Sequence, residues 1–579
     1  MHLFKKIRED IVATLQELVS EGTLPHLSFD AVTAEPPRES EHGDVATNAA
    51  MVLAKPAKKN PRQLAELIKA KLEKYDYITA IEIAGPGFIN LKISVGILHK
   101  VILEVLRKGV NYGDSQIGKG EKINIEYVST NPTGPIHVGH ARGAIYGDTL
   151  AGLLTKAGFK VTKEYYINDA GAQIIKLVDS ALLRYRETMG EKIEIPEGLY
   201  PGEYLIPVGK KLAEKYGKKL TEIPLEEARA EIRDFVVSEM MEIIKSDLVL
   251  LGIKHDVFTS EKKLADEEAV DEAFMLLQEK GLIYQGVLPP PRGKENEEWE
   301  QKELTLFRSS QFGDDSDRPM KKSDGSWAYM APDVAYHHHK IKRGFNNMIL
   351  VLGTDHVGYQ KRLKAAVAAL SDQKANLIVI LCQMVNLLEN GMPIKMSKRA
   401  GNFLTVRDLA EAVGKDVIRF IMLTRSNNMV LDFDLKKVTE QSKDNPVFYV
   451  QYSHTRACSV LRKNAEEIPE KELLNIAEKE LALLTDESEI ALIKLIAEWP
   501  RIVESAAASY EPHRIAFYLH DLAASFHGLW NKGTENSSLR FFIDDNIGLS
   551  KARLAMVKAL KLTIASGLLL LGVKPLEEM

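Results

Sequence analysis

The chain has 579 residues, 45% of them hydrophobic and 27% charged, which is the ordinary balance of a globular protein. This composition excludes a disordered, collagen-like or low-complexity chain, and no apolar run reaches the roughly 18 residues that a membrane helix needs. The net charge of −5 argues against a dedicated nonspecific DNA-binding protein, whereas local basic surfaces remain compatible with RNA binding.

The two cysteines, Cys382 and Cys458, lie far apart in the sequence. They exclude a disulfide scaffold and a zinc site of the CxxC type. The opening residues show an amphipathic helix pattern with charges of both signs, and they lack the apolar core of a signal peptide. We therefore expect a cytoplasmic protein that does not bind membranes.

The first 112 residues predict an α+β domain. The pattern indicates a helix from Pro61 to Tyr75 and two alternating strands, at 78–83 and 88–93, around a Gly-Pro-Gly turn. An earlier helix is indicated by apolar residues at helical spacing: Phe4, Ile7, Ile11 and Leu15.

Residues 113–440 predict a doubly wound, Rossmann-type α/β domain with a parallel sheet. Strand and helix patterns alternate, and the later strands are continuous apolar runs, as expected when both faces of a sheet are covered. A helical insertion is expected near 173–280, and the polar stretch after it predicts a surface hairpin with loops. The expected strands are residues 122–128, 161–169, 347–353 and 376–385.

Residues 441–579 predict an all-α bundle. Apolar positions recur every three or four residues, and helix packing into a bundle is the natural way to bury them. Breaks between the helices are marked by prolines: Pro446, Pro500 and Pro512.

The first motif with chemical meaning is a strand followed by a histidine-bearing helix start. The prolines that follow strand 122–128 end it, and a helix is expected to begin near His137. His137 and His140 then share one face of the helix N-terminus, where backbone N–H groups attract phosphate. Gly139 has no side chain, so a flat base could lie against the backbone. A structural histidine pair would show the same pattern. The motif comprises Asn131, Pro132, Thr133, Gly134, Pro135, Ile136, His137, Val138, Gly139, His140 and Ala141.

The second motif is a short lysine-bearing loop within residues 390–402. Lys395 and Lys398 bracket Met396 and Ser397. Two lysines on such a loop can stabilise the negative charge that develops on a departing pyrophosphate. Taken alone, a lysine-rich loop is more often a solvated surface, so the interpretation depends on the first motif being present as well.

HxGH after a strand, with KMSK later in the same α/β block, resembles the signatures of class I aminoacyl-tRNA synthetases. Longer segments along essentially the whole chain resemble the arginyl-tRNA synthetase family. The resemblance implies activation of L-arginine with ATP, release of pyrophosphate, and transfer of arginine to the 3′ end of its tRNA. The segments include HGDVATNAA (42–50), IEYVSTNPTGPIHVGHARGAIYGD (125–148), SWAYMAPDVAYH (326–337), VLGTDHVGYQKRL (351–363) and NPVFYVQYSHTRACSV (445–460).

A guanidinium is a planar cation with five donors, so a selective pocket should supply acidic groups and planar acceptors. Glu126 lies near the end of the first strand of the α/β block, and Tyr329 and Asp333, four residues apart, are expected to share one helix face. Taken singly, Glu126 could be an exposed strand residue and Tyr329 a packing residue. The resemblance places five residues at the arginine substrate: Glu126, Asn131, Tyr329, Asp333 and Gln360.

For ATP, Asp355 and His356 follow strand 347–353, and ligands of open α/β sheets bind beyond the carboxyl ends of strands. Mg²⁺ is expected to come with ATP, because it prefers phosphate oxygens and water to a protein cage. No zinc is expected; the consecutive His337, His338 and His339 cannot all face one ion. The resemblance implies a catalytic set of His137, His140, Lys395 and Lys398. It implies further ATP contacts at Gly139, Asp355, His356, Met396 and Ser397.

The C-terminal block resembles the family's anticodon-binding domain, and the N-terminal block resembles its additional tRNA-contacting domain. Tyr449, Tyr452 and His454 are candidate stacking partners for unpaired bases, although they could equally pack the bundle. No proofreading insertion is apparent, which fits arginine because no common amino acid imitates a forked guanidinium. The resemblance also implies a monomer.

Three other interpretations compete. A cysteinyl synthetase has a similar size but uses a zinc site that two isolated cysteines do not provide. A nucleotidyltransferase that adenylates a small acid does not need a helical C-terminal block. A synthetase-like RNA-binding protein without activity has no chemical reason to retain the histidines and lysines of both motifs.

Overall fold

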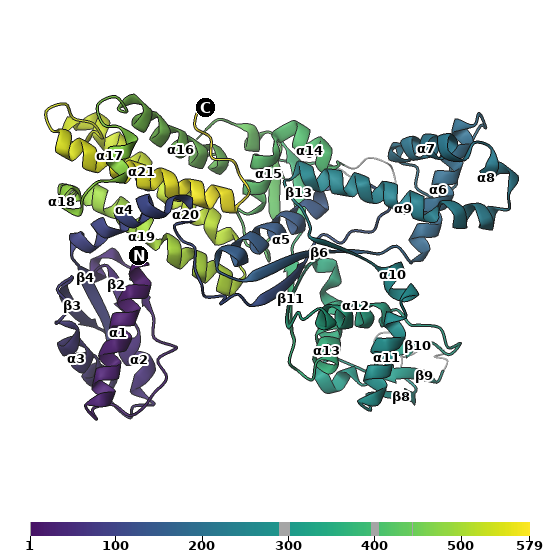
Figure 1. Cartoon of the computed structure of the whole chain (residues 1–579), viewed down its shortest axis with the longest axis horizontal. Helices are drawn as coiled ribbons and strands as arrows, with labels where there is room; N and C mark the ends of the chain where they lie inside the picture. The colour runs from purple at the N-terminus through teal and green to yellow at the C-terminus, as the bar shows by residue number, and fades with distance from the viewer. Residues whose placement is uncertain (1, 289–301, 395–403, 443) are drawn as a thin grey trace. The chain divides into compact units, whose positions relative to one another are not determined.

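A computed structural model describes residues 2–288, 302–394, 404–442 and 444–579. The chain forms two compact units (Figure 1). Unit 1 comprises Met1–Ser115, Gln441–Tyr510 and Arg514–Met579, and unit 2 comprises Gln116–Glu440 with Glu511–His513. Within the described residues, no helix combines the length and the apolar character needed to cross a membrane.

Unit 2 is built on a five-stranded parallel sheet with the order β12-β11-β5-β6-β7. The chain runs outward from β5 to β7 and then returns to the other side of β5, so the strand order reverses between β5 and β11. In doubly wound sheets, ligands bind at such a reversal, beyond the carboxyl ends of the strands. The predicted doubly wound sheet is confirmed. Its strands are β5 (Lys122–Glu126), β6 (Lys160–Ile167), β7 (Val257–Ser260), β11 (Asn347–Gly353) and β12 (Asn376–Cys382).

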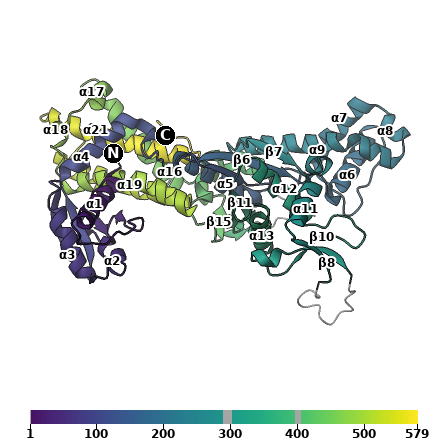
Figure 2. The same cartoon turned by 60° about the horizontal axis from the view of Figure 1, so that its bottom comes forward.

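Helix α5 (Val138–Lys156) follows β5 and lies against β6 and β11 (Figure 2). It is rich in small residues because it packs closely on the sheet. A Cβ at Gly147 would lie only 2.3 Å from the ring of Tyr127, the residue after β5. A larger residue at this position would therefore push the helix away from the strand end that carries the first motif.

The helical insertion follows β6, and its helices α6, α7 and α8 lie together at one end of unit 2 in both views (Figures 1 and 2). The longest helix, α9, leads back to β7. The insertion consists of α6 (Ala172–Thr188), α7 (Ile206–Tyr216), α8 (Lys219–Glu222) and α9 (Leu225–Leu250).

A small antiparallel sheet, β10-β9-β8, packs with three helices around a second apolar core in unit 2. The antiparallel pair of β9 and β10 corresponds to the predicted hairpin, whereas β8 precedes the polar stretch. Part of that stretch, residues 289–301, lies outside the described residues. The elements are α11 (Ala269–Glu279), β8 (Ile283–Gly286), β9 (Leu304–Phe307), β10 (Arg318–Lys321), α12 (Ala331–Lys342) and α13 (Gln360–Leu370), and the short helix α10 (Glu261–Asp266) precedes them.

The apolar run expected as one strand at 376–385 is divided between two sheets. β12 ends at Cys382, where the amide of Gln383 turns to donate to the carbonyl of Asn427 at 2.8 Å. The carbonyl of Gln383 accepts from the buried guanidinium of Arg142 at 3.1 Å. The rest of unit 2 is a second small sheet, β14-β13-β15, and two helices: β13 (Val385–Glu389), β14 (Met392–Pro393), α14 (Val406–Val413), α15 (Lys415–Met422) and β15 (Leu431–Asp434).

Unit 1 begins with an antiparallel sheet, β1-β2-β4-β3, beside which α1 and α3 pack (purple in Figure 1). The predicted helix and strands of this region are present, with the second helix ending at Leu72. The elements are α1 (Leu3–Ser20), β1 (Ala34–Glu35), β2 (Val45–Thr47), α2 (Ala49–Ala54), α3 (Pro61–Leu72), β3 (Ile78–Ala84), β4 (Phe88–Ile93) and α4 (Val95–Lys108).

The C-terminal part of unit 1 is helical, as predicted, and it shares a core with the N-terminal part. The expected break at Pro500 is wrong, because this proline lies inside α19. The indole Nε1 of Trp499 donates to the carbonyl of Tyr112 at 2.8 Å. A Cβ at Gly113, whose φ is +93°, would lie 2.5 Å from that indole. The helices are α16 (Pro446–Lys463), α17 (Glu470–Leu474), α18 (Glu478–Leu481), α19 (Glu487–Ser509), α20 (His513–Glu535) and α21 (Ile547–Leu570).

Candidate active site

The connection from β5 to α5 places two histidines face to face at a helix start. His137 immediately precedes α5, and His140 lies in its first turn. Their imidazole rings stack, with centroids 3.6 Å apart and planes at 25°. A Cβ at Gly139 would lie 2.9 Å from Cε1 of His137. The glycine therefore leaves room for the ring pair, and the three residues expected at ATP lie together.

The loop before these histidines is held by the helical insertion. The hydroxyl of Tyr204 donates to the carbonyl of Thr133 at 2.7 Å. The same ring lies 3.0 Å from where a Cβ at Gly134 would be, so the loop and the ring are in close contact. Asn131, expected at the arginine substrate, donates from Nδ2 to Oε1 of Gln173 at 2.9 Å.

The residues that follow the lysine-bearing segment pair with this loop. The amide of Val406 donates to the carbonyl of Ile136 at 2.8 Å, and the amide of Val138 donates to the carbonyl of Leu404 at 3.2 Å. The chain therefore leaves the second motif directly beside the backbone of the first. Four predicted residues, Lys395, Met396, Ser397 and Lys398, lie outside the described residues.

Three carboxylates gather where strands of the parallel sheet end. Glu126 is the last residue of β5, Glu261 begins α10 directly after β7, and Asp333 lies in the first turn of α12. Burial raises the pKa of Asp333 to about 7, and the charges of Glu261 and Glu126 contribute to this shift. Burial also raises the pKa of Glu261, against a hydrogen bond from Tyr166. Because these acids repel one another, binding a cation among them relieves that repulsion.

Glu126 already has a cationic partner. Nζ of Lys340 lies 2.6 Å from Oε2 of Glu126, and their side chains are 1% and 7% exposed. The hydroxyl of Ser129 donates to the other carboxylate oxygen at 3.0 Å. The alternative that Glu126 is an exposed strand residue is therefore wrong. Lys340 therefore balances the charge of Glu126, whereas Asp333 and Glu261 lie beside each other as acids.

The sequence did not point to Glu261 or to Lys340. A carboxylate directly after a strand of a parallel sheet was a signal for Glu261, because such positions face the ligand crevice. No local pattern identifies Lys340, since its partner lies 214 residues away in the chain.

Tyr329 does not share a helix face with Asp333, contrary to the expectation. Helix α12 begins at Ala331, with Pro332 in its first turn, and a proline there disfavours helix in the residues before it. The Tyr329 side chain is 76% exposed, so it is not a packing residue. Its ring contacts that of Tyr359 edge-on at 6.0 Å, directly before Gln360, the first residue of α13.

Asp355 and His356 lie in a short 3₁₀ helix, η5 (Thr354–Tyr359), that follows β11. Their side chains are exposed and form an ion pair at 3.4 Å when the histidine is protonated. Because β11 neighbours β5 at the reversal of strand order, these residues lie at the end of the sheet where the first motif begins. Their placement fits the expected contact with ATP.

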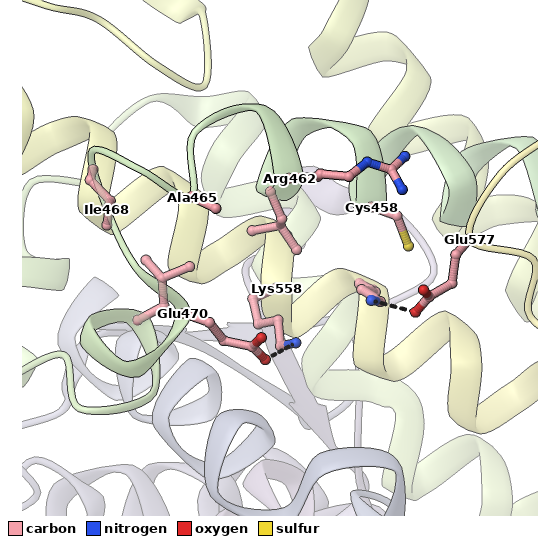
Figure 3. Close-up of a pocket in the computed structure, with 10 residues that line it drawn as sticks. Cys458, Arg462, Ala465, Ile468, Glu470, Lys558 and Glu577 are labelled. Atoms are coloured by element: carbon pink, nitrogen blue, oxygen red, sulfur yellow. Dashed lines mark hydrogen bonds and ion pairs between the residues drawn. The ribbon is translucent and has the colours of Figure 1, made fainter.

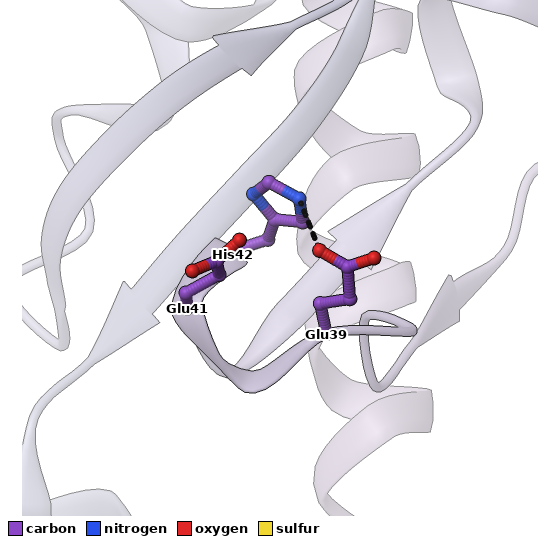
Figure 4. Close-up of side chains that lie close together, drawn as sticks. All are labelled: Glu39, Glu41 and His42. Carbon is purple, nitrogen blue, oxygen red and sulfur yellow. Dashed lines mark ion pairs between the residues drawn. The ribbon is translucent and has the colours of Figure 1, made fainter.

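The three consecutive histidines of α12 are not among the close groups of potential metal ligands in the described part of the chain. Burial lowers the pKa of His337 to about 4, and its Nδ1 lies 2.8 Å from the carbonyl of Asp333. Among the described residues, the one group of three close potential ligands is Glu39, Glu41 and His42, on an exposed turn of unit 1 (Figure 4).

Aromatic side chains of α16 and α20 interleave with a cation in unit 1. The rings of Tyr452 and His527 stack at 5.7 Å, and Tyr449 lies 4.7 Å from His527. The guanidinium of Arg456 lies 4.5 Å from the ring of Tyr452 and 4.3 Å from that of Trp530. Rings with a nearby cation are the surface on which single-stranded bases stack.

His454 differs from these tyrosines, and the expected RNA contact is corrected for it. The residue is 2% exposed, and its Nδ1 lies 2.7 Å from the carbonyl of Leu576. Its ring is therefore covered by the C-terminal segment and presents no face to a base.

A cavity of about 190 Å³ lies between α16 and α21 of unit 1 (Figure 3). Nζ of Lys558 is 2.5 Å from Glu470, and Nζ of Lys561 is 3.2 Å from Glu577. Burial raises the pKa of the neighbouring Cys458 thiol. Acids of the same unit therefore balance the charges of both lysines.

Three stretches of the chain match known family models. Residues 5–93 match "Arginyl tRNA synthetase N terminal domain", residues 101–201 match "tRNA synthetases class I (R), catalytic domain", and residues 450–579 match "DALR anticodon binding domain". The matches thus fall in all three sequence blocks, and the second one contains the paired histidines.

Similarity to characterised proteins extends over the full length. The arginine–tRNA ligase of Ruegeria pomeroyi is 52% identical over 580 residues, and that of Parvibaculum lavamentivorans is 53% identical over 585, each match covering 100% of both chains. The solved arginyl-tRNA synthetase of Thermus thermophilus is 20% identical, with a TM-score of 0.72 and coverage of 100% of both chains. The last comparison supports the fold.

Proposed function

The chain belongs to the arginyl-tRNA synthetase family, and on that premise we propose how its residues carry out the reaction. As an arginine–tRNA ligase, it activates L-arginine with ATP to arginyl-adenylate and pyrophosphate. It then transfers arginine to the 3′ end of its tRNA. The role proposed for each residue is based on its contacts in unit 2.

The guanidinium binds between Asp333 and Glu261. The observation that supports this assignment is the carboxylate cluster, in which Asp333 and Glu261 are half-buried and the pKa of Asp333 is raised to about 7. Glu126, neutralised by Lys340, shapes the end of the pocket and contributes less net charge. The exposed phenol of Tyr329 lies against the substrate side chain. Asn131 and Gln360 bind its α-amino and carboxylate end.

The triphosphate binds at the start of α5. His137 and His140 add imidazole donors to the backbone N–H groups there, and Asp355 and His356 contact the ribose or adenine. The arginine carboxylate attacks the α-phosphorus, the bond to the β-phosphate breaks, and pyrophosphate leaves. Lys395 and Lys398 stabilise the charge on the leaving group. Mg²⁺ accompanies the phosphates and neutralises part of their charge.

The second step brings in tRNA. The terminal ribose hydroxyl attacks the carbonyl carbon of the adenylate, and AMP leaves. Tyr449, Tyr452 and Arg456 provide a stacking surface for anticodon bases, and the N-terminal part of unit 1 contacts another part of the tRNA. We place the enzyme in the cytoplasm as a monomer without protein-bound zinc.

Pyrophosphate exchange with cognate tRNA present tests the arginine assignment. Asp333→Asn should raise the KM for arginine at least tenfold, since a charge-assisted contact contributes about 1.5–3 kcal/mol. Asp372→Asn is the matched control, because this carboxylate is exposed and pairs with Lys280 in the same unit. An unchanged KM in Asp333→Asn, or equal exchange with lysine, would contradict the assignment.

A further inference from the structure

Asp247 is a buried carboxylate outside the substrate site that contacts the chain beside both motifs. It lies on α9 of the insertion, and its side chain is 1% exposed. One carboxylate oxygen accepts from the amide of Ile136 at 3.1 Å. The other accepts from Nη2 of Arg407 at 3.0 Å. Ile136 directly precedes His137, and Arg407 lies in the first turn of α14, shortly after the lysine-bearing segment in sequence.

The two segments that Asp247 joins already lie side by side, but their pairing is short. It consists of two backbone hydrogen bonds around an isolated bridge between His137 and Thr405. Thr405 also begins α14 through a capping box with Asp408, so the helix start is well defined. A side chain that bonds to both segments would fix the register of such a short pairing.

Keeping a carboxylate in this position has a cost. Burial raises the pKa of Asp247, and the Ile136 amide and the Arg407 guanidinium only partly oppose this shift. A buried ion pair seldom adds net stability compared with apolar packing. A local arrangement that is unfavourable in itself is expected where function requires it.

We propose that Asp247, together with Arg407, is a positioning residue for arginine activation: it fixes the start of α5 against the start of α14. This inference depends on the proposed function of the two motifs. Groups that act on one triphosphate must be aligned, and a misplacement of about 1 Å can reduce a rate roughly 100-fold. The acids of the arginine pocket come from other elements, so arginine binding should not depend on Asp247.

The test uses the full-length enzyme in tRNA-dependent pyrophosphate exchange, with arginine binding and the melting temperature measured in parallel. Asp247→Asn retains an acceptor for the Ile136 amide but cannot pair with Arg407. Its kcat should fall about 10- to 100-fold, with arginine affinity within twofold of wild type. Arg407→Ala should lower kcat by a smaller factor, and Arg407→Lys should restore part of the loss.

Arg229→Ala is the matched control, because Arg229 forms an ion pair from the same helix to Asp179 at 2.6 Å without touching either motif. It should leave kcat within twofold of wild type. Unchanged kcat in both Asp247→Asn and Arg407→Ala, or an equal loss in Arg229→Ala, would overturn the inference. If Asp247→Asn does not fold, the kcat of Arg407→Ala alone tests the inference. The Arg407 side chain is 44% exposed, so its removal should not prevent folding. An inactive wild-type enzyme would instead refute the proposed function.

Discussion

If Asp333 binds the guanidinium as proposed, its ionisation should control how strongly the site attracts arginine. Its pKa of about 7 means that about half of these carboxyl groups are protonated at neutral pH, whereas the guanidinium stays charged. Only the ionised form pairs with the cation, so affinity rises with pH through 7 and binding below that pH releases a proton. Arginine affinity without ATP should therefore be about tenfold weaker at pH 6 than at pH 8. Calorimetry in buffers of different ionisation enthalpy measures both effects.

Asp333→Asn provides the control for this pH dependence, because an amide does not titrate. Binding should become weak and nearly independent of pH between 6 and 8. A variant that keeps the wild-type slope would show that another group is responsible.

Single residues were predictable from the sequence where their geometry is local. Two histidines three apart at a helix start must lie near each other, and they stack at 3.6 Å. The partners of Glu126 were not predictable to the same degree: Ser129 is a near neighbour, whereas Lys340 reaches it only through the packing of α12. Glu261 joins the pocket for the same reason, because the end of β7 meets the start of α12 only in the folded sheet.

The insertion supports the loop between β5 and α5 through Tyr204. Tyr204→Phe removes the hydrogen bond to Thr133 while keeping the ring against Gly134. The loss of this hydrogen bond should destabilise the loop by about 1 kcal/mol. We expect kcat for pyrophosphate exchange to fall severalfold and amide hydrogen exchange of the loop to accelerate. Tyr216→Phe is the control, because the Tyr216 hydroxyl donates a hydrogen bond to the carbonyl of Glu231, elsewhere in the insertion. Equal behaviour of the two variants would argue against a bracing role.

Strands and helices were predicted correctly where the spacing of apolar residues alone determines them. The apolar runs of β11 and β12 predicted buried strands correctly, since both faces of the sheet are covered. The division after Cys382 was not predictable, because it depends on the contacts of Gln383 with Asn427 and Arg142. The late start of α12 could have been inferred from Pro332, which restricts the residues before it.

The two ends of the chain form one compact unit with Trp499 in its core, and we expect this unit to unfold cooperatively. Replacing this fully buried side chain by alanine should destabilise unit 1 by about 3–5 kcal/mol. The helices and the N-terminal sheet should then unfold together at a lower temperature in calorimetry. Trp530→Ala removes a half-buried indole of the same unit and should cost less. Separate melting of the N-terminal part in Trp499→Ala would contradict a shared core.

At the scale of the whole molecule, the sequence predicts three blocks with different secondary-structure patterns, and the structure groups the residues into two compact units. That the first and last blocks fold together rests on contacts such as Trp499 with Tyr112, which are 387 residues apart in the chain. No pattern in a single sequence encodes a pairing over that distance.

The affinity of a non-hydrolysable arginyl-adenylate analogue tests the central claim most directly, because the analogue occupies both halves of the site at once. His140→Ala and Asp333→Asn should each weaken its binding at least tenfold, and the corresponding lysyl analogue should bind far more weakly to the wild-type enzyme. Wild-type affinity in either variant would show that the stacked histidines and the acid cluster do not serve one substrate complex.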